Sequence, residues 1–430
     1  MIKGRPWLKK KSKRKNLELL FFIPTLVHAT RLVDSIFNLT QVVYQKETSQ
    51  IYLGSPSIVR IRSTGNLLIS SDRFGPGSGV EGGPRNVSIH SQVSEDEWDV
   101  LCWVPGMYWS SLFQLKAASD KDVFLLGTET DGPAPLKIAR SRDGGVTWLS
   151  TDAAVIAGEL RGNMSYETGP TAVVEFGGRI YRAIERLAPP LFRWGVDFQA
   201  VVASAPVANC SSAENISCID ALTDPASWSL SPPLPFNISW LEGFEQPPAA
   251  PGFLEGNMVM GPDGETLYNI LRMDDTENQV PNFWGNRAIL LRYDPPPVNQ
   301  LSFDAIVDFP GGHSKFVVRR HDSGLYVTLS NPTLNPKYTD QRNELYVCVS
   351  TDLRNWTRGS SAVLFDDTGL ALSRDDSVRY TGFHYVDWQF DGENDEDIVM
   401  AVRTAYRGAV SYHNSNRITT MTLKGWKGWA

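Results

Sequence analysis

The sequence predicts an all-β protein built as a six-bladed β-propeller, in which every blade is a four-stranded antiparallel sheet. Three observations support this prediction. Short β-branched and aromatic runs, separated by Gly, Pro, Asn and Asp, recur from end to end of the chain. The runs group into six similar units of roughly 50–70 residues, a spacing typical of propeller blades. Two units carry a turn with the same order of Ser, Asp and Trp.

The best-defined of these turns is Ser141–Trp148, which reads Ser-x-Asp-x-Gly-x-Thr-Trp. Asp143 can accept hydrogen bonds from backbone N–H groups of its own turn. The two glycines that follow it can adopt the positive φ that a tight hairpin requires. A degenerate copy occurs at Ser350–Trp356. We expect the tryptophan that ends each turn to be largely buried across its blade.

The predicted strands are rich in Val, Ile, Leu and aromatic residues, and each is bounded by turn residues. In the first three units they are Ser57–Arg62, Asn66–Ser71, Asn86–Ser91 and Trp98–Val104; Ser110–Leu115, Val123–Gly127 and Leu136–Ser141; and Thr171–Phe176, Arg179–Ile184 and Phe198–Ser204.

In the last three units they are Asn257–Met260, Thr266–Leu271, Ala288–Tyr293 and Phe303–Asp308; Lys315–Arg319, Leu325–Leu329 and Glu344–Ser350; and Tyr385–Phe390, Asp397–Val402 and Arg417–Leu423. An early strand over Phe37–Gln45 is expected to close the ring against the last unit. A β-sandwich and a parallel β-helix are the alternatives, and the turn pattern and the spacing favour the propeller.

The beginning of the chain has the pattern of a secretory signal. A basic run over residues 3–15 precedes an apolar run over residues 17–27, and Val27-His28-Ala29 supplies a small-residue cleavage site. The apolar run is too short to span a bilayer. We therefore expect a signal peptide over residues 1–29, a single propeller domain over residues 30–430, and a secreted protein with no membrane span after cleavage.

Charge and sequons narrow the range of partners. Removal of residues 1–29 takes away eight basic residues and one acidic residue, which leaves a formal net charge of −14. A chain this acidic is a poor partner for nucleic acid or anionic membranes. Asn-x-Ser/Thr sequons agree with secretion and lie at Asn38, Asn86, Asn163, Asn209, Asn215, Asn237 and Asn355.

The four cysteines suggest no metal site. Cys210 and Cys218 flank a Ser- and Asn-rich loop and can pair in an oxidising compartment. Cys102 and Cys348 lie in apolar strand-like runs and are expected to be buried thiols. No spacing suggests zinc, so we expect neither a metal nor a cofactor in the chemistry, and a structural calcium ion stays open.

The predicted topology gathers polar residues at one mouth of the central channel, where concave sites form in propellers. The starts of the innermost strands and the ends of the second strands meet there. A single charge at a strand end is usually just solvated, but repetition at equivalent blade positions indicates a site. The residues at these positions are Asp72, Trp109, Glu167, Glu185, Glu255, Arg272, His313, Asn331, His384, Tyr385 and Arg403, with Asp387 close by.

Four segments resemble the sialidase superfamily. The turn at Ser141–Trp148 matches the Asp box, or BNR repeat, of those propellers. Leu254–Arg272 resembles their fourth blade, in which a Glu starts the blade and an Arg of a carboxylate-binding triad ends its second strand. Ser330–Asp352 resembles the fifth blade, with another triad arginine, and Gly382–Asp387 resembles the start of the last blade, with a nucleophilic Tyr. The resemblance assigns these roles to Glu255, Arg272, Arg342 and Tyr385.

The resemblance implies a mechanism that suits these residue types. The guanidinium groups of Arg272 and Arg342 each hold a substrate carboxylate through two parallel hydrogen bonds. Tyr385 attacks the sugar without placing a second carboxylate against it, and Glu255 accepts its proton. Asp72, on a first-blade loop, is the candidate acid for the leaving oxygen, and Glu81 on the same loop is the alternative. The further candidates for substrate contacts are Trp109, Glu185, His313, Asn331, Asp387 and Arg403.

The chain departs from the family in the first blade, where Gly54 and Ser55 stand in place of the third triad arginine. It is therefore expected to be a sialidase-like relative rather than a strict sialidase. The predicted function is a secreted exo-glycoside hydrolase that removes a terminal, acidic sugar from a glycan. The alternatives are a non-catalytic carbohydrate-binding propeller and a polysaccharide lyase that uses Tyr385 with a histidine such as His384. The sugar, the linkage and the oligomeric state stay open.

Overall fold

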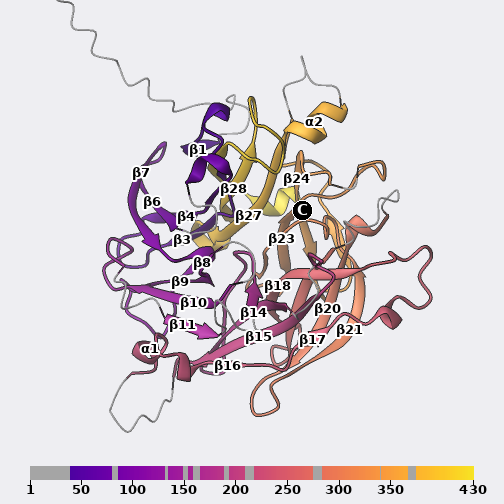
Figure 1. Cartoon of the computed structure of the whole chain (residues 1–430), viewed down its shortest axis with the longest axis horizontal. Helices are drawn as coiled ribbons and strands as arrows, with labels where there is room; N and C mark the ends of the chain where they lie inside the picture. The colour runs from indigo at the N-terminus through magenta and orange to yellow at the C-terminus, as the bar shows by residue number, and fades with distance from the viewer. Residues whose placement is uncertain are drawn as a thin grey trace, which may run out of the picture.

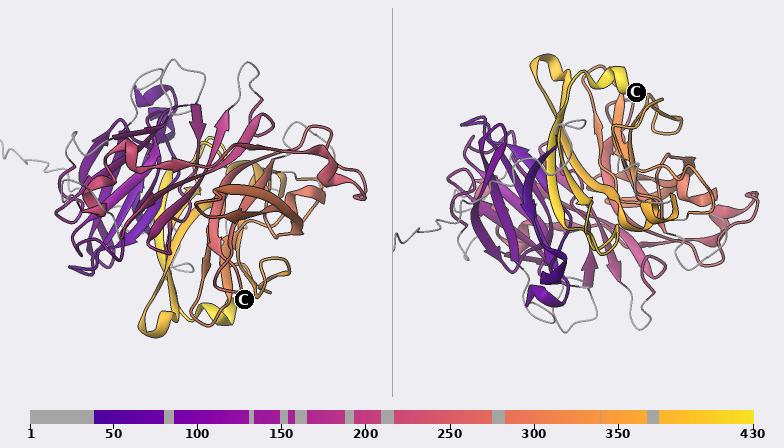
Figure 2. Two further views of the ribbon diagram at one scale, coloured as in Figure 1. Left: turned by 90° about the horizontal axis from the view of Figure 1, so that it is seen from below. Right: turned by 90° about the horizontal axis from the view of Figure 1, so that it is seen from above.

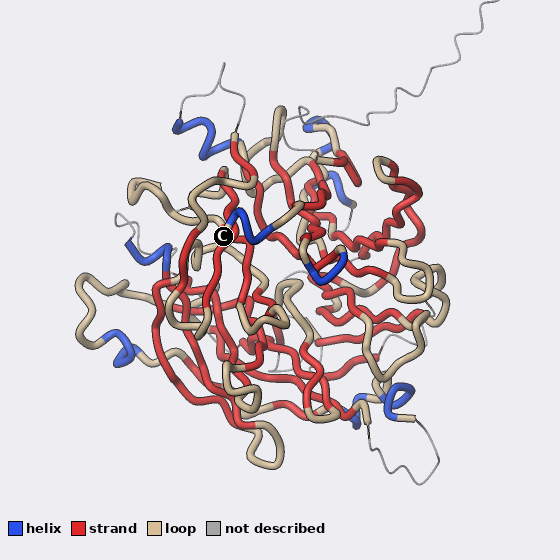
Figure 3. The backbone as a smooth tube through the Cα atoms, turned by 180° about the vertical axis from the view of Figure 1, so that it is seen from behind, coloured by secondary structure: helices blue, strands red, loops and turns tan. Residues whose placement is uncertain are grey.

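The computed structural model describes residues 39–79, 86–130, 134–148, 154–157, 165–187, 193–208, 217–274, 283–338, 340–366 and 374–430. Strands dominate this part of the chain, and its helices are short (Figure 3). The sheets stand around a common centre, and the chain runs from one sheet to the next around the ring (Figure 1). The protein is a six-bladed β-propeller of antiparallel blades, which confirms the predicted fold class.

Each blade contains a path of four strands, ordered from the centre of the ring outwards. The first three blades are β3 (Ser57–Arg60), β4 (Leu67–Ser71), β6 (Asn86–Ser94) and β7 (Glu97–Pro105); β8 (Tyr108–Phe113), β9 (Val123–Thr128), β10 (Leu136–Ser141) and β11 (Ala154–Ala157); and β12 (Ser165–Glu167), β14 (Arg179–Leu187), β15 (Phe198–Pro206) and β16 (Ser229–Leu230). In the third blade β13 (Val174–Phe176) also pairs with β14, and β17 (Leu234–Pro235) pairs with β15.

The last three blades are β18 (Gly252–Met260), β19 (Leu267–Asp274), β20 (Arg287–Asp294) and β21 (Gln300–Asp308); β22 (Val318–Arg320), β23 (Tyr326–Ser330), β24 (Glu344–Ser350) and β25 (Trp356–Arg358); and β27 (Gly382–Asp391), β28 (Asp397–Ala405), β29 (Arg417–Leu423) and β1 (Thr40–Tyr44). In the fifth blade β26 (Leu364–Phe365) also pairs with β24.

The remaining elements are short and lie between or beside the blades. They are the hairpin of β2 (Tyr52–Leu53) and β5 (Arg73–Phe74), the α-helices α1 (Cys218–Ala221) and α2 (Arg374–Tyr380), and the 3₁₀ helices η1 (Glu47–Ser49), η2 (Pro76–Ser78), η4 (Pro225–Ser227), η5 (Ile238–Leu241), η6 (Phe283–Asn286), η7 (Glu393–Asp395) and η8 (Trp426–Trp429). No helix in the described ranges is long and apolar enough to cross a membrane.

The ring closes where the two ends of the chain meet in one blade. The early strand β1 pairs antiparallel with β29, with Thr40 opposite Thr420 and Tyr44 opposite Arg417. Figures 1 and 2 show the indigo β1 beside the yellow strands of the sixth blade. The predicted closing strand over Phe37–Gln45 is confirmed within its described part. This pairing joins segments almost a full chain length apart, so one blade fastens the whole ring.

The innermost strand of the third blade differs from its prediction. A strand over Thr171–Phe176 was expected, but β13 covers only the second half of that run. The run is preceded by Gly169 and Pro170, and neither residue favours a continuous ladder. A separate short strand, β12, pairs with the other end of β14, with Glu167 opposite Glu185. The break therefore brings two glutamates face to face near the centre.

The hydrophobic core lies between neighbouring blades. A large cluster fills each of the six interfaces around the ring, including the interface of blades six and one, where Ile58 and Ile69 pack with Val399 and Ile418. Alternate residues of each strand face the two neighbouring blades, so these strands are apolar on both faces. Stability is consequently spread around the ring, and the channel at the centre is left to polar side chains.

Polar side chains on the innermost strands also join the blades. Asp387 of blade six accepts hydrogen bonds from the hydroxyl of Ser57 at 2.6 Å and the backbone N–H of Ile58 at 2.9 Å, both in blade one. The Ser57 hydroxyl oxygen accepts the backbone N–H of Leu112, in blade two, at 2.9 Å. Arg319 of blade five donates to the other oxygen of Asp387 at 3.1 Å. One buried carboxylate therefore ties three blades.

The same pattern continues through the other blades. The Ser111 hydroxyl donates to the Thr171 carbonyl at 2.7 Å, and the Thr171 hydroxyl donates to the Gly256 carbonyl at 2.7 Å. Asn257 of blade four then donates to the Phe316 carbonyl of blade five at 3.1 Å. These bonds form a closed series around the channel. We call its side chains the interblade belt: Ser57, Ser111, Thr171, Asn257, Arg319 and Asp387.

The two Asp-containing turns have the hydrogen bonds expected from their sequences. Asp143 accepts the Thr147 backbone N–H at 2.9 Å and the Thr147 hydroxyl at 2.6 Å. Asp352 accepts the backbone N–H of Asn355 at 2.8 Å in the second turn. Trp148 and Trp356 each donate to the carbonyl three residues earlier. Each indole packs against the hydrophobic cluster between its own blade and a neighbouring blade, so most of its surface is covered, as expected.

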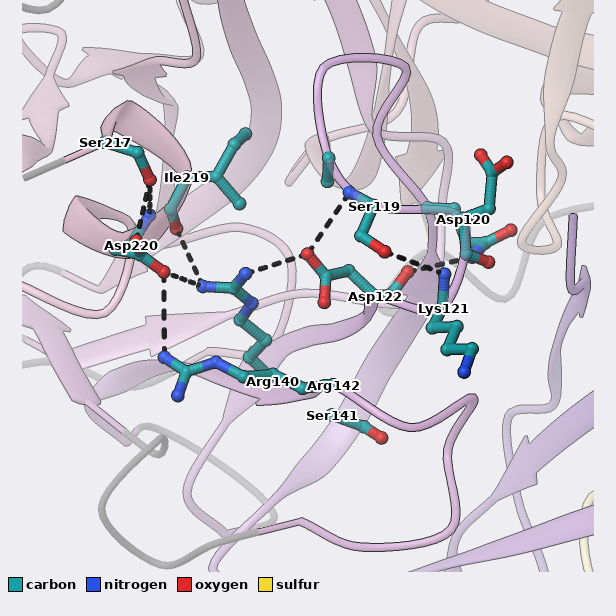
Figure 4. A network of polar contacts seen from close by, with 12 residues as sticks. Ser119, Asp120, Lys121, Asp122, Arg140, Ser141, Arg142, Ser217, Ile219 and Asp220 are labelled. Carbon is teal, nitrogen blue, oxygen red and sulfur yellow. Dashed lines mark hydrogen bonds and ion pairs between the residues drawn. The ribbon is translucent and has the colours of Figure 1, made fainter. Parts of the chain in front are cut away.

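A buried arginine fixes the outer part of the second blade. Arg140 in β10 donates to Asp122 at 2.7 Å and to Asp220 of α1 at 2.6 Å (Figure 4). Cys218 at the start of α1 is disulfide-bonded. Cys210, its proposed partner, lies outside the described residues. Cys348 is a buried free thiol, whereas Cys102 is partly exposed rather than buried.

Several other predictions also fall outside the described ranges. These are the signal peptide over residues 1–29, the alternative acid Glu81, and the sequons at Asn38, Asn163, Asn209 and Asn215.

Candidate functional site

The site is built on three β-bulges in alternate blades. The innermost strands β8, β18 and β27 each lose register near their start, beside the end of the second strand. At each bulge one residue has positive φ: Trp109 at 45°, Glu255 at 55° and Tyr385 at 53°. Such a conformation costs a non-glycine residue about 1–3 kcal/mol and is concentrated at functional sites. All three residues were predicted as site residues.

Each bulge is held by a buried charged residue of the preceding blade. Asp72 accepts the backbone N–H of Trp109 at 3.2 Å, and Glu185 accepts the backbone N–H of Gly256 at 3.0 Å. Lys315 donates to the two bulge carbonyls of β27 at 3.3 and 3.1 Å. Blades one, three and five thus fix the bulges of blades two, four and six. The strained backbone persists because hydrogen bonds to a buried ionisable side chain compensate it at each bulge.

Five predicted residues come together around one phenol. We call Glu255, Arg272, Arg342, Tyr385 and Arg403 the Tyr385 cluster. The Nη1 atom of Arg272 lies 2.9 Å from Oε2 of Glu255 and 3.3 Å from the Tyr385 hydroxyl. Four members are at most 6% exposed, whereas Tyr385 is partly exposed. Tyr385 is therefore the least buried residue of the cluster.

Two further guanidinium groups lie over the Tyr385 ring. The central carbons of Arg342 and Arg403 lie 5.7 and 5.1 Å from the ring centroid. Arg342 also lies 5.1 Å from the Tyr412 ring, and Arg403 lies 5.1 Å from the Phe74 ring. The third cation of the cluster is therefore Arg403 of the sixth blade, rather than an arginine at the start of the first. An anionic group of a ligand would be attracted to the space beside these three guanidinium groups.

The environment of Tyr385 keeps its phenol protonated in the resting site. Burial and the nearby carboxylate of Glu255 raise the pKa of Tyr385 to about 12, against the opposing effect of Arg272, Arg342 and Arg403. A neutral phenol is a weak nucleophile and needs a base. Glu255 is the carboxylate that contacts the same Arg272 nitrogen as the phenol, so it is suitably placed for that role.

His384 is held in one neutral form beside Arg342. Its Nδ1 lies 3.2 Å from Nη1 of Arg342, and its Nε2 lies 3.0 Å from the Tyr412 carbonyl. Arginine can only donate, so Nδ1 accepts and the ring proton sits on Nε2. Burial, together with the positive charges of Arg403 and Arg342, holds the pKa of His384 well below its usual value. Both ring nitrogens are therefore used within the protein, which disfavours His384 as the base of a lyase.

Glu167 and Glu185 form a buried carboxyl pair behind Glu255. They lie opposite each other on β12 and β14 and are 2% and 0% exposed. Burial, followed by repulsion from Glu185 and Glu255, raises the pKa of Glu167 well above its usual value. Burial likewise raises the pKa of Glu185 to about 7. Near neutral pH, Glu167 therefore carries a proton and donates it to Glu185 in a hydrogen bond.

This pair should make the stability of the protein depend on pH. Both folded-state pKa values lie above their unfolded values, so the stabilisation is complete below the unfolded pKa near 4.5 and is lost as pH rises through about 7. Glu167→Gln keeps a donor toward Glu185 without titrating. Urea unfolding of the wild type should show lower stability at about pH 8 than at about pH 5. The variant should reduce that difference by on the order of 2 kcal/mol.

The control for this experiment is Glu175→Gln on β13, whose carboxylate is partly exposed and accepts a backbone N–H of Lys116 at 2.9 Å. It should leave the pH dependence as in the wild type. An unchanged pH dependence in Glu167→Gln would show that the pair shares no proton.

Three of the predicted site residues outside the Tyr385 cluster make their hydrogen bonds within the fold. Asn331 donates to the carbonyls of Glu344 and Phe383, each at 2.8 Å. The two ring nitrogens of His313 lie within 3.1 Å of backbone carbonyls, and burial lowers its pKa to about 4. Asp387 belongs to the interblade belt. All three side chains therefore bond to backbone groups of the protein.

Two buried cations near the site were not predicted from the sequence. Lys315 was assigned only to a strand, although burial lowers its pKa to about 8 and it holds the Tyr385 bulge. Arg182 is 1% exposed and donates to Thr168, Gly169 and Thr171, around the break before β13. A basic residue inside an apolar strand is the sequence signal that could have identified either of them. Both face the carboxylates of the channel.

A metal site is not evident in the parts of the chain that the structure describes. There, no group of three or more His, Cys, Asp or Glu side chains is arranged to hold a metal ion. The carboxylates at the centre are instead matched by arginines and a lysine. The arrangement places three guanidinium groups and one carboxylate around a phenol, a combination that suits the binding of an anion.

Comparison with known proteins identifies the fold. No protein-family profile and no curated protein sequence matches the chain. Among solved structures, an α-L-arabinanase of Penicillium chrysogenum complexed with arabinobiose is 13% identical, with a TM-score of 0.56 over 91% of this chain and 99% of that one.

Two further structures are similar at the same level. A GH93 α-L-arabinofuranosidase of Fusarium graminearum complexed with arabinobiose is 11% identical, with a TM-score of 0.54 over 90% of this chain and 96% of that one. The Hadza microbial sialidase Hz136 is 13% identical, with a TM-score of 0.51 over 87% of this chain and 66% of that one. At these identities the likeness shows a shared propeller fold.

Proposed function

We propose that this protein is a glycoside hydrolase that removes a terminal, acidic sugar from a glycan. The observation that carries the proposal is the Tyr385 cluster, in which one phenol and one carboxylate contact the same Arg272 nitrogen. Propellers similar in fold include an arabinanase, an arabinofuranosidase and a sialidase, which supports action on glycans. The exo mode is proposed because the site lies at one end of the inner strands, where a blind channel mouth would accommodate a chain end.

In the proposed mechanism each residue has one task. Tyr385 attacks the anomeric carbon while Glu255 accepts the phenol proton, and the glycosidic oxygen leaves with a proton from Asp72. Water then attacks the anomeric carbon and gives a proton to Asp72, while Glu255 returns its proton to the phenol oxygen as the glycosyl–tyrosine bond breaks. Arg342 and Arg403 hold the substrate carboxylate beside the ring, with Arg272 between base and nucleophile. Asp72 is 1% exposed, so its acid role requires the substrate to reach the Trp109 bulge.

The proposal also includes secretion and a sialidase-like type of chemistry. The signal-like segment over residues 1–29 and the sequons support secretion. Cleavage after Ala29 can be tested by expression in a eukaryotic host. The protein is recovered from the culture medium and its N-terminus is sequenced. Retention of the protein inside the cell with residue 1 intact would contradict it.

The direct test is a hydrolysis screen on secreted protein. The substrates are the 4-methylumbelliferyl glycosides of N-acetylneuraminic acid, glucuronic acid, galactose and arabinose. Release of the fluorophore from an acidic sugar, with a saturated sugar as the second product, supports the proposal. In a parallel incubation with a uronate-containing polysaccharide, formation of an unsaturated uronate would instead identify a lyase. Binding without cleavage would identify a carbohydrate-binding propeller.

A second prediction concerns the arginine clamp. Arg342→Ala should weaken binding of a free acidic sugar by about ten- to a hundredfold, because a charge-assisted pair contributes roughly 1.5–3 kcal/mol. Binding of a neutral sugar should change far less. Arg342→Lys should restore little, because an ammonium group lacks the planar fork. Calorimetric titration with N-acetylneuraminate, glucuronate and galactose measures all three effects.

The matched control for the clamp is Arg292→Ala. Arg292 lies in β20, and its pair with Asp294 is solvent-exposed. It should bind every sugar as the wild type does. Equal affinity of acidic and neutral sugars for the wild type and for Arg342→Ala would exclude the clamp.

A further inference from the structure

A second aromatic surface lies beside the candidate acid. The loop between β14 and β15 presents Trp194, which is 38% exposed. Its ring packs edge-to-face against Trp109, with centroids 6.0 Å apart, and against the buried Phe198, with centroids 5.2 Å apart. Trp109 in turn donates its backbone N–H to Asp72 at 3.2 Å. The aromatic pair of Trp109 and Trp194 is therefore continuous with the candidate site.

The turn that carries Trp194 is fixed in place. The backbone carbonyl of Trp194 accepts the Val196 N–H at 2.8 Å. Arg193 and Asp197 form an ion pair at 2.8 Å across the turn. Phe253 at the start of β18 donates its backbone N–H to the Gly195 carbonyl at 3.3 Å. The same turn approaches Gly252 so closely that a Cβ there would lie 2.3 Å from the Gly195 oxygen. Blades three and four thus hold the indole in one position.

The chemistry of this surface differs from that of the Tyr385 cluster. Arg193 and Asp197 neutralise each other, so the charges beside the indole balance. A flat, apolar, partly exposed indole matches the C–H face of a neutral sugar ring, whose hydroxyl groups point outward into water. Arg342 and Arg403 of the cluster match a carboxylate instead. The two surfaces therefore suit two different sugars of one glycan.

We propose that Trp194 and Trp109 form a stacking subsite for a neutral sugar ring, namely the leaving-group sugar that follows the terminal acidic one. Its assignment to the leaving group rests on the proposed function, because Asp72, the candidate acid for the leaving oxygen, is bonded to the backbone of Trp109. The terminal sugar then lies at the arginines of the Tyr385 cluster, and the next sugar stacks on the indoles of Trp109 and Trp194. This arrangement selects substrates with an acidic end followed by a neutral ring.

The test measures binding, so it does not require turnover. Lactose, cellobiose and arabinobiose are titrated separately into the wild type, Trp194→Ala and Trp194→Phe by calorimetry. At least one disaccharide should bind the wild type, and Trp194→Ala should weaken it about tenfold through the loss of the stacking face. Trp194→Phe keeps an aromatic ring and should stay within about threefold of the wild type. Binding of glucuronate and N-acetylneuraminate should be unchanged in both variants.

The matched control is Trp103→Ala. Trp103 is 42% exposed, but it lies on the outer strand β7 against Arg73, with 4.3 Å between the guanidinium carbon and the ring centroid. This variant should bind the disaccharides as the wild type does. A wild type that binds none of the three disaccharides would overturn the proposal. Equal affinities of the wild type and Trp194→Ala would overturn it as well.

The outcome separates this inference from the proposed function. Loss of disaccharide binding in Trp194→Ala, together with no hydrolysis by the wild type, would retain the subsite and reject the hydrolase. Hydrolysis by the wild type with unaltered disaccharide binding in Trp194→Ala would reject the subsite and retain the hydrolase.

Discussion

Tyr385→Phe should lower turnover by about a thousandfold or more while binding of an acidic sugar stays nearly intact. The change removes one hydroxyl, which lies 3.3 Å from Nη1 of Arg272, and leaves the ring beneath Arg342 and Arg403. Without that oxygen no glycosyl–tyrosine bond can form. Steady-state hydrolysis of the best substrate from the screen measures turnover, and calorimetry with the matching free sugar measures binding.

Tyr412→Phe is the matched control for this change. Tyr412 also lies under Arg342, at 5.1 Å, and it interacts with Asp340 rather than with Glu255. Its loss of a hydroxyl should change turnover by less than about tenfold. If both variants retained wild-type turnover, the nucleophile would have to be another group, and Tyr385 would serve only as a ligand for the three arginines.

Asp387→Ala should lower the free energy of unfolding by about 3–5 kcal/mol, the largest stability effect that we expect from a single change. The carboxylate is 3% exposed and accepts bonds from Ser57, Ile58, Arg319 and the backbone N–H of Trp388. Its removal leaves these donors buried and unsatisfied and opens the interblade belt at two interfaces. Urea unfolding at neutral pH measures the loss.

Asp391→Ala, on the same strand, provides the comparison for this effect. Its pair with Arg60 lies at 2.7 Å, but both side chains are more than a fifth exposed. Exposed pairs contribute about 0–1 kcal/mol, so the change should be small. A loss in Asp387→Ala no greater than that in Asp391→Ala would mean that the belt adds little to the closure of the ring.

The sequence was sufficient for the fold because each blade carries its own local signals. Alternation of apolar residues, turn glycines and the Ser141–Trp148 pattern act within a single blade, and a ring of six follows from six such units. The closing strand was also recognisable, since an unpaired apolar strand at the start of the chain needs a partner. The predicted limits of a strand were wrong where a local break interrupts the chain, as at Gly169 and Pro170 before β13.

Five residues that the sequence assigned to a site come together in the structure, and their roles in a reaction stay a prediction. Glu255, Arg272, Arg342, Tyr385 and Arg403 occupy equivalent ends of strands, and a shared topology alone brings such positions together. Individual partners could not be predicted, because an ion pair or a shared proton depends on distances of a few ångströms between separate blades. The same reason explains why His313, Asn331 and Asp387 were expected to face a substrate but instead hold backbone groups.

The sequence by itself determined six blades, their order, and the set of charged residues that one end of the inner strands receives. Only the tertiary structure decided how those charges are used. It placed Lys315 behind the Tyr385 bulge, set Arg403 over the Tyr385 ring, and paired Glu167 with Glu185. Strand periodicity is a property of neighbouring residues, whereas burial, bulges and charge pairing arise only when distant blades close around one axis.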